Sequence, residues 1–422
     1  MKKSIYNVEK TIGDSTWVFN TLSGSFIKLD TITWSKIDES GMQSIQKQLV
    51  TLGFVVEDDY DETLSYKLRY YRSAFDDKLM FIDIAPTMKC NFACYYCFED
   101  GNKNFPVMND ETEQNIIKYL EANKKKQIVI NWFGGEPLMG FERIVSITKQ
   151  LEEKGVDFRA SIITNGSLLT SDKSKMLDGL HLDKIQITLD GVGDIHDNRR
   201  CFASGKPSFS IIINNIEGFL SYCSVPLVIQ VTVDKTNRSA YEDVYAYFNQ
   251  NFGRYMESHR IQIGKNHVQN RTGFDTHSIC FSSRDLIDDL LKKIKRGHGD
   301  VALPGLSLPC MFRKISSFSI DSQGNIYHCL EHLGNPSCKI GNVNEGKILL
   351  SKLASNIMGD DPFADKDCLS CRVFPICGGG CPIDRLKRVK DGVMDYCSIY
   401  KDKLEDLLPF FYKYIYEKDS GN

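Results

Sequence analysis

Six short apolar runs, rich in β-branched residues, recur between residues 80 and 264, and helical patterns separate most of them. The runs are MFIDIAP, QIVINWF, FRASIIT, KIQITLD, PLVIQVTV and RIQIG. Strands that alternate with helices fold as parallel β/α units joined by right-handed crossovers. Six units are too few for an eight-stranded barrel, so we predict an α/β fold with an open, partial (β/α)6 barrel.

The short segments that follow these runs carry residues suited to chemistry. CNFACYYC (90–97) comes after the first run, GGEP (134–137) after the second, TNG (164–166) after the third and DG (190–191) after the fourth. In β/α barrels the chemistry lies at the carboxyl ends of the strands. The order of these segments therefore predicts one functional site on one rim of the barrel.

Length and charge narrow the class of protein. The chain has 422 residues, enough for two or three domains, and a net charge of −3 that gives no reason to expect a nucleic-acid partner. The N-terminus MKKSIYNVEKTIGD lacks the apolar region of a signal peptide. No stretch approaches the roughly 18 apolar residues of a membrane helix. We therefore expect a cytoplasmic protein whose partners are neither membranes nor nucleic acids.

Cysteine is unusually frequent, with 14 residues in the chain. In a reducing compartment these thiols favour metal binding or catalysis over a disulfide framework. One group follows the first predicted strand, and a larger group lies in the last third of the chain. Cys201, Cys223 and Cys280 stand apart from both groups, and we expect them to be small buried thiols.

The three cysteines of CNFACYYC are one fewer than the four thiolates that fill a [4Fe–4S] cluster. Cys90, Cys94 and Cys97 would leave the fourth iron open, as catalytic metal sites leave one position open. Their CxxxCxxC spacing resembles the signature of radical S-adenosylmethionine (SAM) enzymes. The resemblance implies an open iron that chelates SAM, and a 5′-deoxyadenosyl radical that abstracts hydrogen from a substrate. The alternative is a zinc site with a distant fourth ligand.

Further segments, in barrel order, resemble the SAM-binding motifs of the same family. Glycine lets the backbone approach a ligand closely, and a carboxylate can accept a hydrogen bond from an ammonium group. The SAM contacts that the resemblance implies are Tyr96, Gly134, Gly135, Glu136, Asn165, Thr188, Arg200 at the end of an HDxxR pattern, and Gln230 or Val231 on the fifth strand. The alternatives for Arg200 and Thr188 are a salt bridge on the rim and an ordinary strand residue.

The cysteines of the last third resemble the SPASM domain, a seven-cysteine module of radical SAM enzymes that act on peptides and proteins. The resemblance implies two auxiliary [4Fe–4S] clusters with interleaved ligands. The first would use Cys310, Cys329 and Cys381, with Cys338 as the candidate for the fourth position; the second would use Cys368, Cys371, Cys377 and Cys397. Gly378–Gly380 would let backbone amides approach cluster sulfurs. The alternative is a pair of zinc sites that use His328 and His332 as ligands. We expect these two histidines to have packing or supporting roles instead.

Residues 1–78 differ in pattern from the barrel and contain no cysteine. TWVFNTLSGSFIKLD predicts two short strands around a Ser-Gly turn, two helices follow, and the acidic EDDYDETL predicts a linker. This order resembles the winged-helix-like module that many peptide maturases use to bind a leader peptide as an added strand; a structural cap is the alternative. The predicted domains are this module (1–78), the barrel (79–304), the SPASM domain (305–405) and a C-terminal helix (406–422) interrupted near Pro409.

The resemblance implies an oxidoreductase that installs a thioether or carbon–carbon crosslink, or a related modification, in a ribosomally made precursor peptide. Its partners would be that peptide and a one-electron reductant such as flavodoxin or ferredoxin. One alternative is an anaerobic sulfatase-maturating enzyme, in which an Asp after the second SPASM cysteine resembles a general base. Here Leu330 holds that place and Glu331, the candidate catalytic residue, follows on the opposite face if the segment is a strand. Another alternative is a non-enzymatic iron–sulfur or zinc protein.

Overall fold

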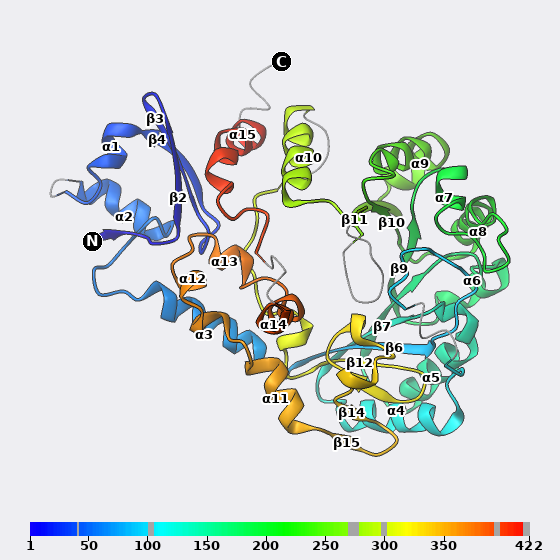
Figure 1. Cartoon of the computed structure of the whole chain (residues 1–422). Coiled ribbons are helices and arrows are strands. Elements are labelled where there is room, and N and C mark those ends of the chain that lie inside the picture. Colours follow the sequence, from blue (N-terminus) through cyan, green and yellow to red (C-terminus); the bar gives the residue numbers. More distant parts are fainter. Residues whose placement is uncertain (40–41, 100–104, 269–277, 297–301, 392–396, 417–422) are drawn as a thin grey trace. The chain divides into compact units, whose positions relative to one another are not determined.

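The computed structural model describes residues 1–39, 42–99, 105–268, 278–296, 302–391 and 397–416. The chain divides into two compact units, each built from segments far apart in the sequence. Unit 1 comprises Met1–Phe75, Ser282–Lys314 and Ile357–Asn422, and unit 2 comprises Asp76–Phe281 and Ile315–Asn356. Figure 1 labels the main helices and strands of both units.

Unit 2 is built on six parallel strands that neighbour one another in chain order. They are β6 (Leu79–Thr87), β7 (Gln127–Gly134), β8 (Phe158–Thr164), β9 (Leu182–Leu189), β10 (Leu227–Val233) and β11 (Ile261–His267). Each strand coincides with one of the six apolar runs. The predicted partial (β/α)6 barrel is therefore confirmed.

Helices connect these strands. They are α4 (Asp110–Ala122), α5 (Phe141–Glu153), α6 (Ser171–Leu177), α7 (Asp194–Asp197), α8 (Phe209–Tyr222) and α9 (Ala240–Glu257), with the 3-10 helix η2 at Pro137–Gly140. In α5, the residues Ile144, Ile147 and Leu151 recur at helical spacing and are fully buried, so this face packs on the core. Figure 1 shows the helices on the outer side of the sheet, leaving its inner side to the site.

A C-terminal hairpin extends the same sheet beyond β6. Strand β12 (Ser317–Ile320) runs parallel to β6, and β13 (Asn325–Tyr327) returns antiparallel to it. Gly324, with a φ of +80°, lies in the turn between β12 and β13. β14 (Gly341–Asn342), β15 (Lys347–Ile348) and α11 (Leu350–Met358) follow. This hairpin therefore belongs to the sheet of the barrel.

Unit 1 contains the predicted N-terminal strands and helices. A sheet of β2 (Asn7–Ile12), β3 (Ser15–Asn20) and β4 (Phe26–Asp30) is followed by α1 (Thr31–Ser35) and α2 (Gln43–Thr51), while β1 (Lys2–Lys3) pairs with β5 (Val55–Val56). Val18 packs in one core cluster with Trp34 and Phe54. A second cluster joins Phe19 and Phe26 to α10 (Ser283–Arg296) and α15 (Leu404–Tyr416). The sheet is thus covered on both faces.

The acidic segment predicted as a linker is in part a helix. Asp61 caps α3 (Glu62–Ala74) by accepting a hydrogen bond from the Leu64 N–H, 2.8 Å away. On the buried face of α3, Tyr66 and Tyr70 pack with aromatic residues of the cysteine-rich segment. The linker prediction was wrong for Glu62–Leu64, because the capping residue is itself acidic and the tyrosines that anchor the helix lie beyond the quoted run.

The cysteine-rich segment also contains short helices. They are η3 (Met311–Arg313), η6 (Pro362–Ala364), α12 (Lys366–Leu369), α13 (Phe374–Cys377) and α14 (Pro382–Asp391). Helix α15 continues through Pro409, so the predicted interruption was wrong; four buried side chains, Leu404, Leu407, Leu408 and Phe411, hold it in place. The predicted extension of this helix over 417–422 lies outside the described residues.

Packing divides the chain differently from the predicted boundaries at 78, 304 and 405. Residues 1–75, 282–314 and 357–422 together form one compact unit. The functional division of the chain stays a prediction. Among the described residues, no helix combines the length and apolar character needed to cross a membrane.

Helix α15 supplies a test of this packing. Phe411 is fully buried in the core cluster shared with the N-terminal sheet, so Phe411→Ala should lower the free energy of unfolding of unit 1 by about 3–5 kcal/mol. Phe410, on the same helix, is 37% exposed, and Phe410→Ala should cost clearly less. Denaturant titration and hydrogen exchange of the β2 and β3 amides measure both effects. Equal losses in the two variants would contradict this packing.

Candidate active site

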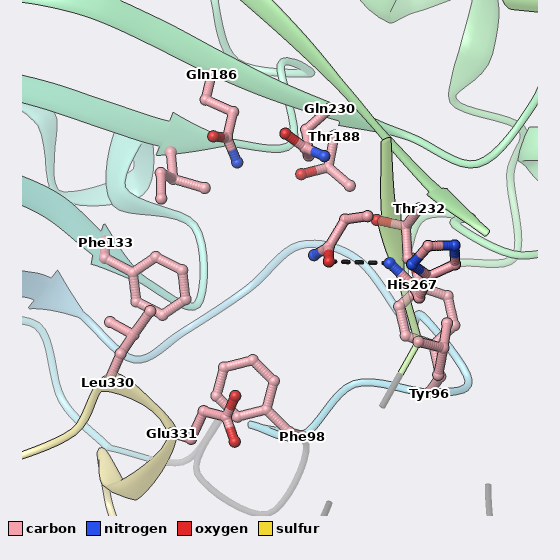
Figure 2. A pocket seen from close by; sticks show the side chains of 13 residues that line it. Tyr96, Phe98, Phe133, Gln186, Thr188, Gln230, Thr232, His267, Leu330 and Glu331 are labelled. Carbon is pink, nitrogen blue, oxygen red and sulfur yellow. Dashed lines mark hydrogen bonds between the residues drawn. The ribbon is translucent and has the colours of Figure 1, made fainter. Parts of the chain in front are cut away.

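The carboxyl ends of the parallel strands surround a pocket of about 320 Å³. Its walls come from β7 to β11, from the cysteine loop that follows β6, and from the 3-10 helix η4 (Leu330–His332) (Figure 2). Phe98 and Phe133 stack at 6.4 Å between ring centroids and form an apolar part of the wall. All these elements belong to unit 2, as the predicted rim requires.

Polar side chains from neighbouring strands form the other part of the wall. Gln186 and Thr188 on β9, and Gln230 and Thr232 on β10, line the pocket, and Thr188 lies beside Gln230 in the strand register. His267 follows on β11. Thr188 and Gln230 were predicted, whereas Val231 is buried in the core. The signal for the missed residues is the alternation of polar and apolar positions in two neighbouring strands.

The predicted ligands of the SAM cluster lie on the loop after β6. The N–H of Phe92 donates to the Cys90 sulfur at 3.4 Å, and the Cys97 N–H donates to the Cys94 carbonyl at 3.2 Å. Burial raises the pKa of Cys90 to about 12, and the nearby Glu136, Cys94 and Cys97 add to this. Three neighbouring, partly buried thiols are suited to binding iron as thiolates, because the metal replaces the proton.

The two glycines of GGEP are required by the backbone of the cysteine loop. A Cβ at Gly134, which has a φ of +113°, would lie 2.3 Å from the Thr87 carbonyl. One at Gly135 would lie 2.4 Å from the Lys89 carbonyl. The close approach deduced from the sequence is therefore an approach of the chain to itself, and it positions the segment that leads into Cys90.

Glu136 joins two strand ends. Its carboxylate accepts hydrogen bonds from the Asn165 N–H and the Thr164 hydroxyl, each at 2.7 Å, and from the Leu138 N–H at 3.0 Å. Glu136 is fully buried, and burial raises its pKa. The Asn165 side chain donates to the Asn91 side chain of the cysteine loop at 2.8 Å. These contacts make Glu136 and Asn165 supports of the loop, and their predicted contact with SAM stays a prediction.

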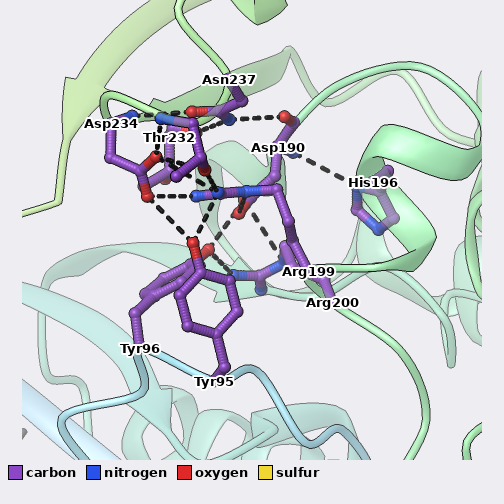
Figure 3. Close-up of polar contacts among 10 residues, drawn as sticks. Tyr95, Tyr96, Asp190, His196, Arg199, Arg200, Thr232, Asp234 and Asn237 are labelled. Atoms are coloured by element: carbon purple, nitrogen blue, oxygen red, sulfur yellow. Dashed lines mark hydrogen bonds and ion pairs between the residues drawn. The ribbon is translucent and has the colours of Figure 1, made fainter. Parts of the chain in front are cut away.

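A buried network links the cysteine loop to β9 and β10 (Figure 3). Arg199 donates from Nε to Asp190 at 2.9 Å, from Nη2 to Asp234 at 2.7 Å and from Nη1 to the Tyr95 hydroxyl at 2.6 Å. The Arg199 side chain is 7% exposed, and both carboxylates are fully buried. Sequence reasoning missed Arg199 although it directly precedes the predicted Arg200.

Arg200 lies beside the same loop. Its Nη1 donates to the Tyr96 hydroxyl at 2.9 Å, and that hydroxyl donates to Asp190 at 2.7 Å. Burial lowers the pKa of Arg200, but Cys94, Tyr96 and Asp190 outweigh burial and raise it. Arg200 therefore places a positive charge next to a predicted cluster ligand. Tyr96 also lines the pocket, as predicted.

The other residues of the HDxxR pattern have structural contacts. His196 accepts from the Asp190 N–H at 3.2 Å through Nδ1, and burial lowers its pKa to about 3, so it is neutral at pH 7. Asp197 accepts from the N–H groups of Ser208 and Phe209, at 2.6 and 2.7 Å, where α8 begins. The pattern thus orients Arg199 and Arg200 from both sides.

Glu331 lines the pocket together with Leu330 (Figure 2). In a strand, Glu331 would point to the face opposite Leu330, and this orientation was expected from the sequence. The segment is instead the 3-10 helix η4, in which consecutive side chains do not alternate between two faces. The expected orientation of Glu331 was therefore wrong, and its candidacy is strengthened.

The four predicted ligands of the second auxiliary cluster all belong to unit 1. Burial raises the pKa of Cys368 to about 11, with Cys377 among the contributing neighbours, and Cys377 also raises that of Cys371. The Lys401 ammonium group donates to the Cys397 sulfur at 3.5 Å. Cys397, and to a smaller extent Cys371, raise the pKa of Lys401. The donor set therefore fits a four-thiolate cluster.

The predicted ligands of the first auxiliary cluster are divided between the units. Cys310 and Cys381 belong to unit 1, and Cys329 and Cys338 to unit 2, so this ligand set stays a prediction. Among the described residues, no three His, Cys, Asp or Glu side chains are grouped to share one metal ion. The thiolates of a cluster bind different irons and need not meet that condition.

Other expectations concerned packing. His328 is fully buried and stacks on Phe318 at 5.7 Å, which confirms a packing role. Cys223 is buried as expected, while Cys201 and Cys280 are half-buried. The three glycines of CGGGC have positive φ values, and a Cβ at Gly378 would meet the Ser307 side chain at 2.6 Å.

Comparisons with known proteins agree with this geometry. Residues 84–246 match the Radical SAM superfamily. The chain is 24% identical to the cysteine-type anaerobic sulfatase-maturating enzyme of Clostridium novyi, over 75% of this chain and 91% of that protein. It is 24% identical to the radical SAM cyclopropyl synthase TigE of Paramaledivibacter caminithermalis, over 91% of this chain and 86% of that protein. It shares its fold with Streptococcus suis SuiB bound to S-adenosylmethionine (TM-score 0.55, 18% identity, 93% of this chain and 97% of that chain).

The chain is therefore an enzyme that carries a radical SAM domain, residues 84–246, in unit 2. Enzymes of this superfamily use SAM and a [4Fe–4S] cluster, and the three thiols after β6 fit that cluster. The cysteine-rich C-terminal region fits auxiliary clusters. The alternative of a non-enzymatic redox or structural protein is not supported.

Removal of one loop thiol tests the cluster assignment. Cys94→Ala should abolish 5′-deoxyadenosine formation from SAM under reducing conditions and lower the iron content from about twelve to about eight per chain. The control is Cys223→Ala, which removes a buried thiol that donates a hydrogen bond to Asp178 and lies outside the cysteine loop. This variant should retain 5′-deoxyadenosine formation and the full iron content. Anaerobic reconstitution, iron analysis and chromatography measure the outcome. Formation of 5′-deoxyadenosine by Cys94→Ala at the wild-type rate would refute the assignment.

Proposed function

We propose that the enzyme is a peptide maturase that abstracts hydrogen from a ribosomally made precursor peptide and installs a thioether or carbon–carbon crosslink or a related modification. The observation that supports this choice is how far the similarity extends. The cyclopropyl synthase aligns with 91% of the chain and SuiB with 93%, whereas the sulfatase-maturating enzyme aligns with 75%. SuiB has also been solved bound to its precursor peptide SuiA.

The chemistry assigns roles to the pocket residues. Bound SAM and its cluster would supply the radical that removes a hydrogen atom, with Tyr96, Gly134, Gly135, Thr188, Arg200 and Gln230 as the proposed SAM contacts. A thioether formed from C–H and S–H releases one hydrogen atom, one electron and one proton. The hydrogen atom leaves on 5′-deoxyadenosine, and the proton passes to a Glu331 carboxylate oxygen. The auxiliary clusters that the C-terminal cysteines would hold would take up the electron, and an oxidised flavodoxin or ferredoxin in the cytoplasm would be its acceptor and, once reduced, the electron donor for the next turnover.

We propose further that the N-terminal sheet binds the leader of the precursor. β4 is an edge strand, and no other strand of the described residues pairs with its outer side. The Asn20 N–H donates to the Ser25 carbonyl at 2.9 Å, and the Thr31 N–H to the Asp14 carbonyl at 3.0 Å. Because antiparallel pairs alternate, the backbone N–H and C=O groups of every second residue of β4, Phe26 among them, point away from β3. An extended leader could therefore add to β4 by backbone hydrogen bonds.

A proline on this edge tests the docking site. Lys28→Pro places a pyrrolidine ring on the side of β4 that points away from β3, where the ring would obstruct an added strand, and proline is tolerated on the solvent side of an edge strand. Binding of the precursor peptide should weaken at least tenfold, or by more than about 1.4 kcal/mol. Modification of that peptide should fall, while SAM cleavage without peptide is unchanged. Fluorescence anisotropy and mass spectrometry report the two quantities.

The matched control for this change is Lys28→Ala. It keeps the N–H but removes the side chain, which lies over the Trp17 ring at 5.3 Å. This variant should bind and modify the peptide nearly as well as the wild type. If Lys28→Pro bound and modified the peptide like Lys28→Ala, the leader would not add to β4, and the structural-cap role of the sheet would stand.

Sulfatase maturation is the second candidate, favoured by the position of Glu331 in the pocket. This activity would convert a Cys or Ser of a sulfatase peptide to formylglycine, and that aldehyde is detected by hydrazine labelling. Formylglycine formation in the sulfatase peptide, together with no change in the precursor peptide, would decide for this alternative.

A further inference from the structure

A buried arginine in unit 1 contacts one of the predicted ligands of the second auxiliary cluster. Arg385 lies on α14 and is 3% exposed. Its Nη1 donates to the Cys368 sulfur at 3.3 Å. The same nitrogen donates to the Gly379 carbonyl at 3.2 Å, within the CGGGC turn. Arg385 thus joins two segments that carry cluster cysteines.

Two carboxylates fix the orientation of this guanidinium. Arg385 pairs through Nε with Asp360 at 3.2 Å and through Nη2 with Asp365 at 2.9 Å. Asp365 is itself held by the N–H groups of Asp367 and Cys368 at 2.9 and 3.4 Å. A guanidinium presents its donors in a rigid planar fork, so filling two positions aims the third at the sulfur.

A second cation contacts another ligand of the same set. The Lys401 ammonium group lies 3.5 Å from the Cys397 sulfur. Two of the four predicted ligands therefore have a cationic donor at their sulfur, one buried and one exposed. Hydrogen bonds and positive charge at ligand sulfurs favour the reduced cluster, because reduction adds a negative charge.

We propose that Arg385 and Lys401 are positioning residues that raise the reduction potential of the cluster held by Cys368, Cys371, Cys377 and Cys397. This inference rests on the proposed auxiliary cluster. Its consequence is that this cluster accepts the electron released when the peptide radical is converted to product. The carboxylates beside Arg385 do not reverse the sign, because the guanidinium is the group in contact with the sulfur.

The test is a redox titration followed by electron paramagnetic resonance in the Cys94→Ala background, where only auxiliary clusters remain. Arg385→Gln and Lys401→Met should each lower the ratio of reduced to oxidised cluster at a fixed potential. We expect at least a tenfold change for Arg385→Gln, equivalent to about 59 mV for a one-electron couple. Lys403→Met removes an equally exposed cation with no described contact to a cysteine, and should leave the ratio unchanged.

Each outcome bears on the proposal. Unchanged potentials in Arg385→Gln and Lys401→Met, with all auxiliary iron present, would overturn the inference while leaving the cluster assignment intact. If Arg385→Gln lost the cluster by misfolding, Lys401→Met would decide, because its side chain is exposed. A Cys94→Ala protein without about eight irons would instead overturn the auxiliary clusters themselves, and this inference with them.

Discussion

The ion pairs of Arg199 with Asp190 and Asp234 determine where the cysteine loop of the radical SAM domain lies. The two carboxylates come from the ends of β9 and β10, and Tyr95, on the loop, donates to Asp234 at 3.0 Å and accepts from Arg199. Removing one partner of a buried ion pair costs about 3–5 kcal/mol, because a charge is left without compensation. The loop is therefore held in one position before any cofactor binds, which a cluster with an open iron requires.

The same arrangement recurs at the cysteine-rich segment of unit 1. There Arg385 lies between Asp360 and Asp365 and contacts Cys368, as Arg199 lies between two aspartates and contacts the loop. In both places a buried guanidinium, oriented by two carboxylates, supports a segment that bears thiols. The N-terminal module is part of this support, since Tyr66 of α3 donates to the Ser307 carbonyl, and Ser307 lies against Gly378. Within unit 1, the N-terminal segment and the cysteine-rich segment therefore pack together.

Periodicity predicted the barrel strands and the rim on which the site lies, and spacing identified the two groups of cysteines. These features could be predicted because they depend on local sequence. Contacts between distant segments were not accessible in this way. Asp190 lies 9 residues before Arg199, and Asp234 lies 35 residues after it. Nothing in the segment HDNRR distinguishes Arg199 from Arg200. Glu331 was turned to the wrong face because a 3-10 helix of three residues has no periodic signal. The helical character of α3 was masked by its acidic start.

The central claim is that this enzyme takes a hydrogen atom from a peptide, and isotope transfer tests it most directly. The reconstituted, reduced protein would be incubated with SAM and a deuterated form of its precursor peptide. The account predicts that deuterium appears in 5′-deoxyadenosine and that the peptide changes in mass at the same rate. Formation of 5′-deoxyadenosine without deuterium, together with an unchanged peptide, would contradict it.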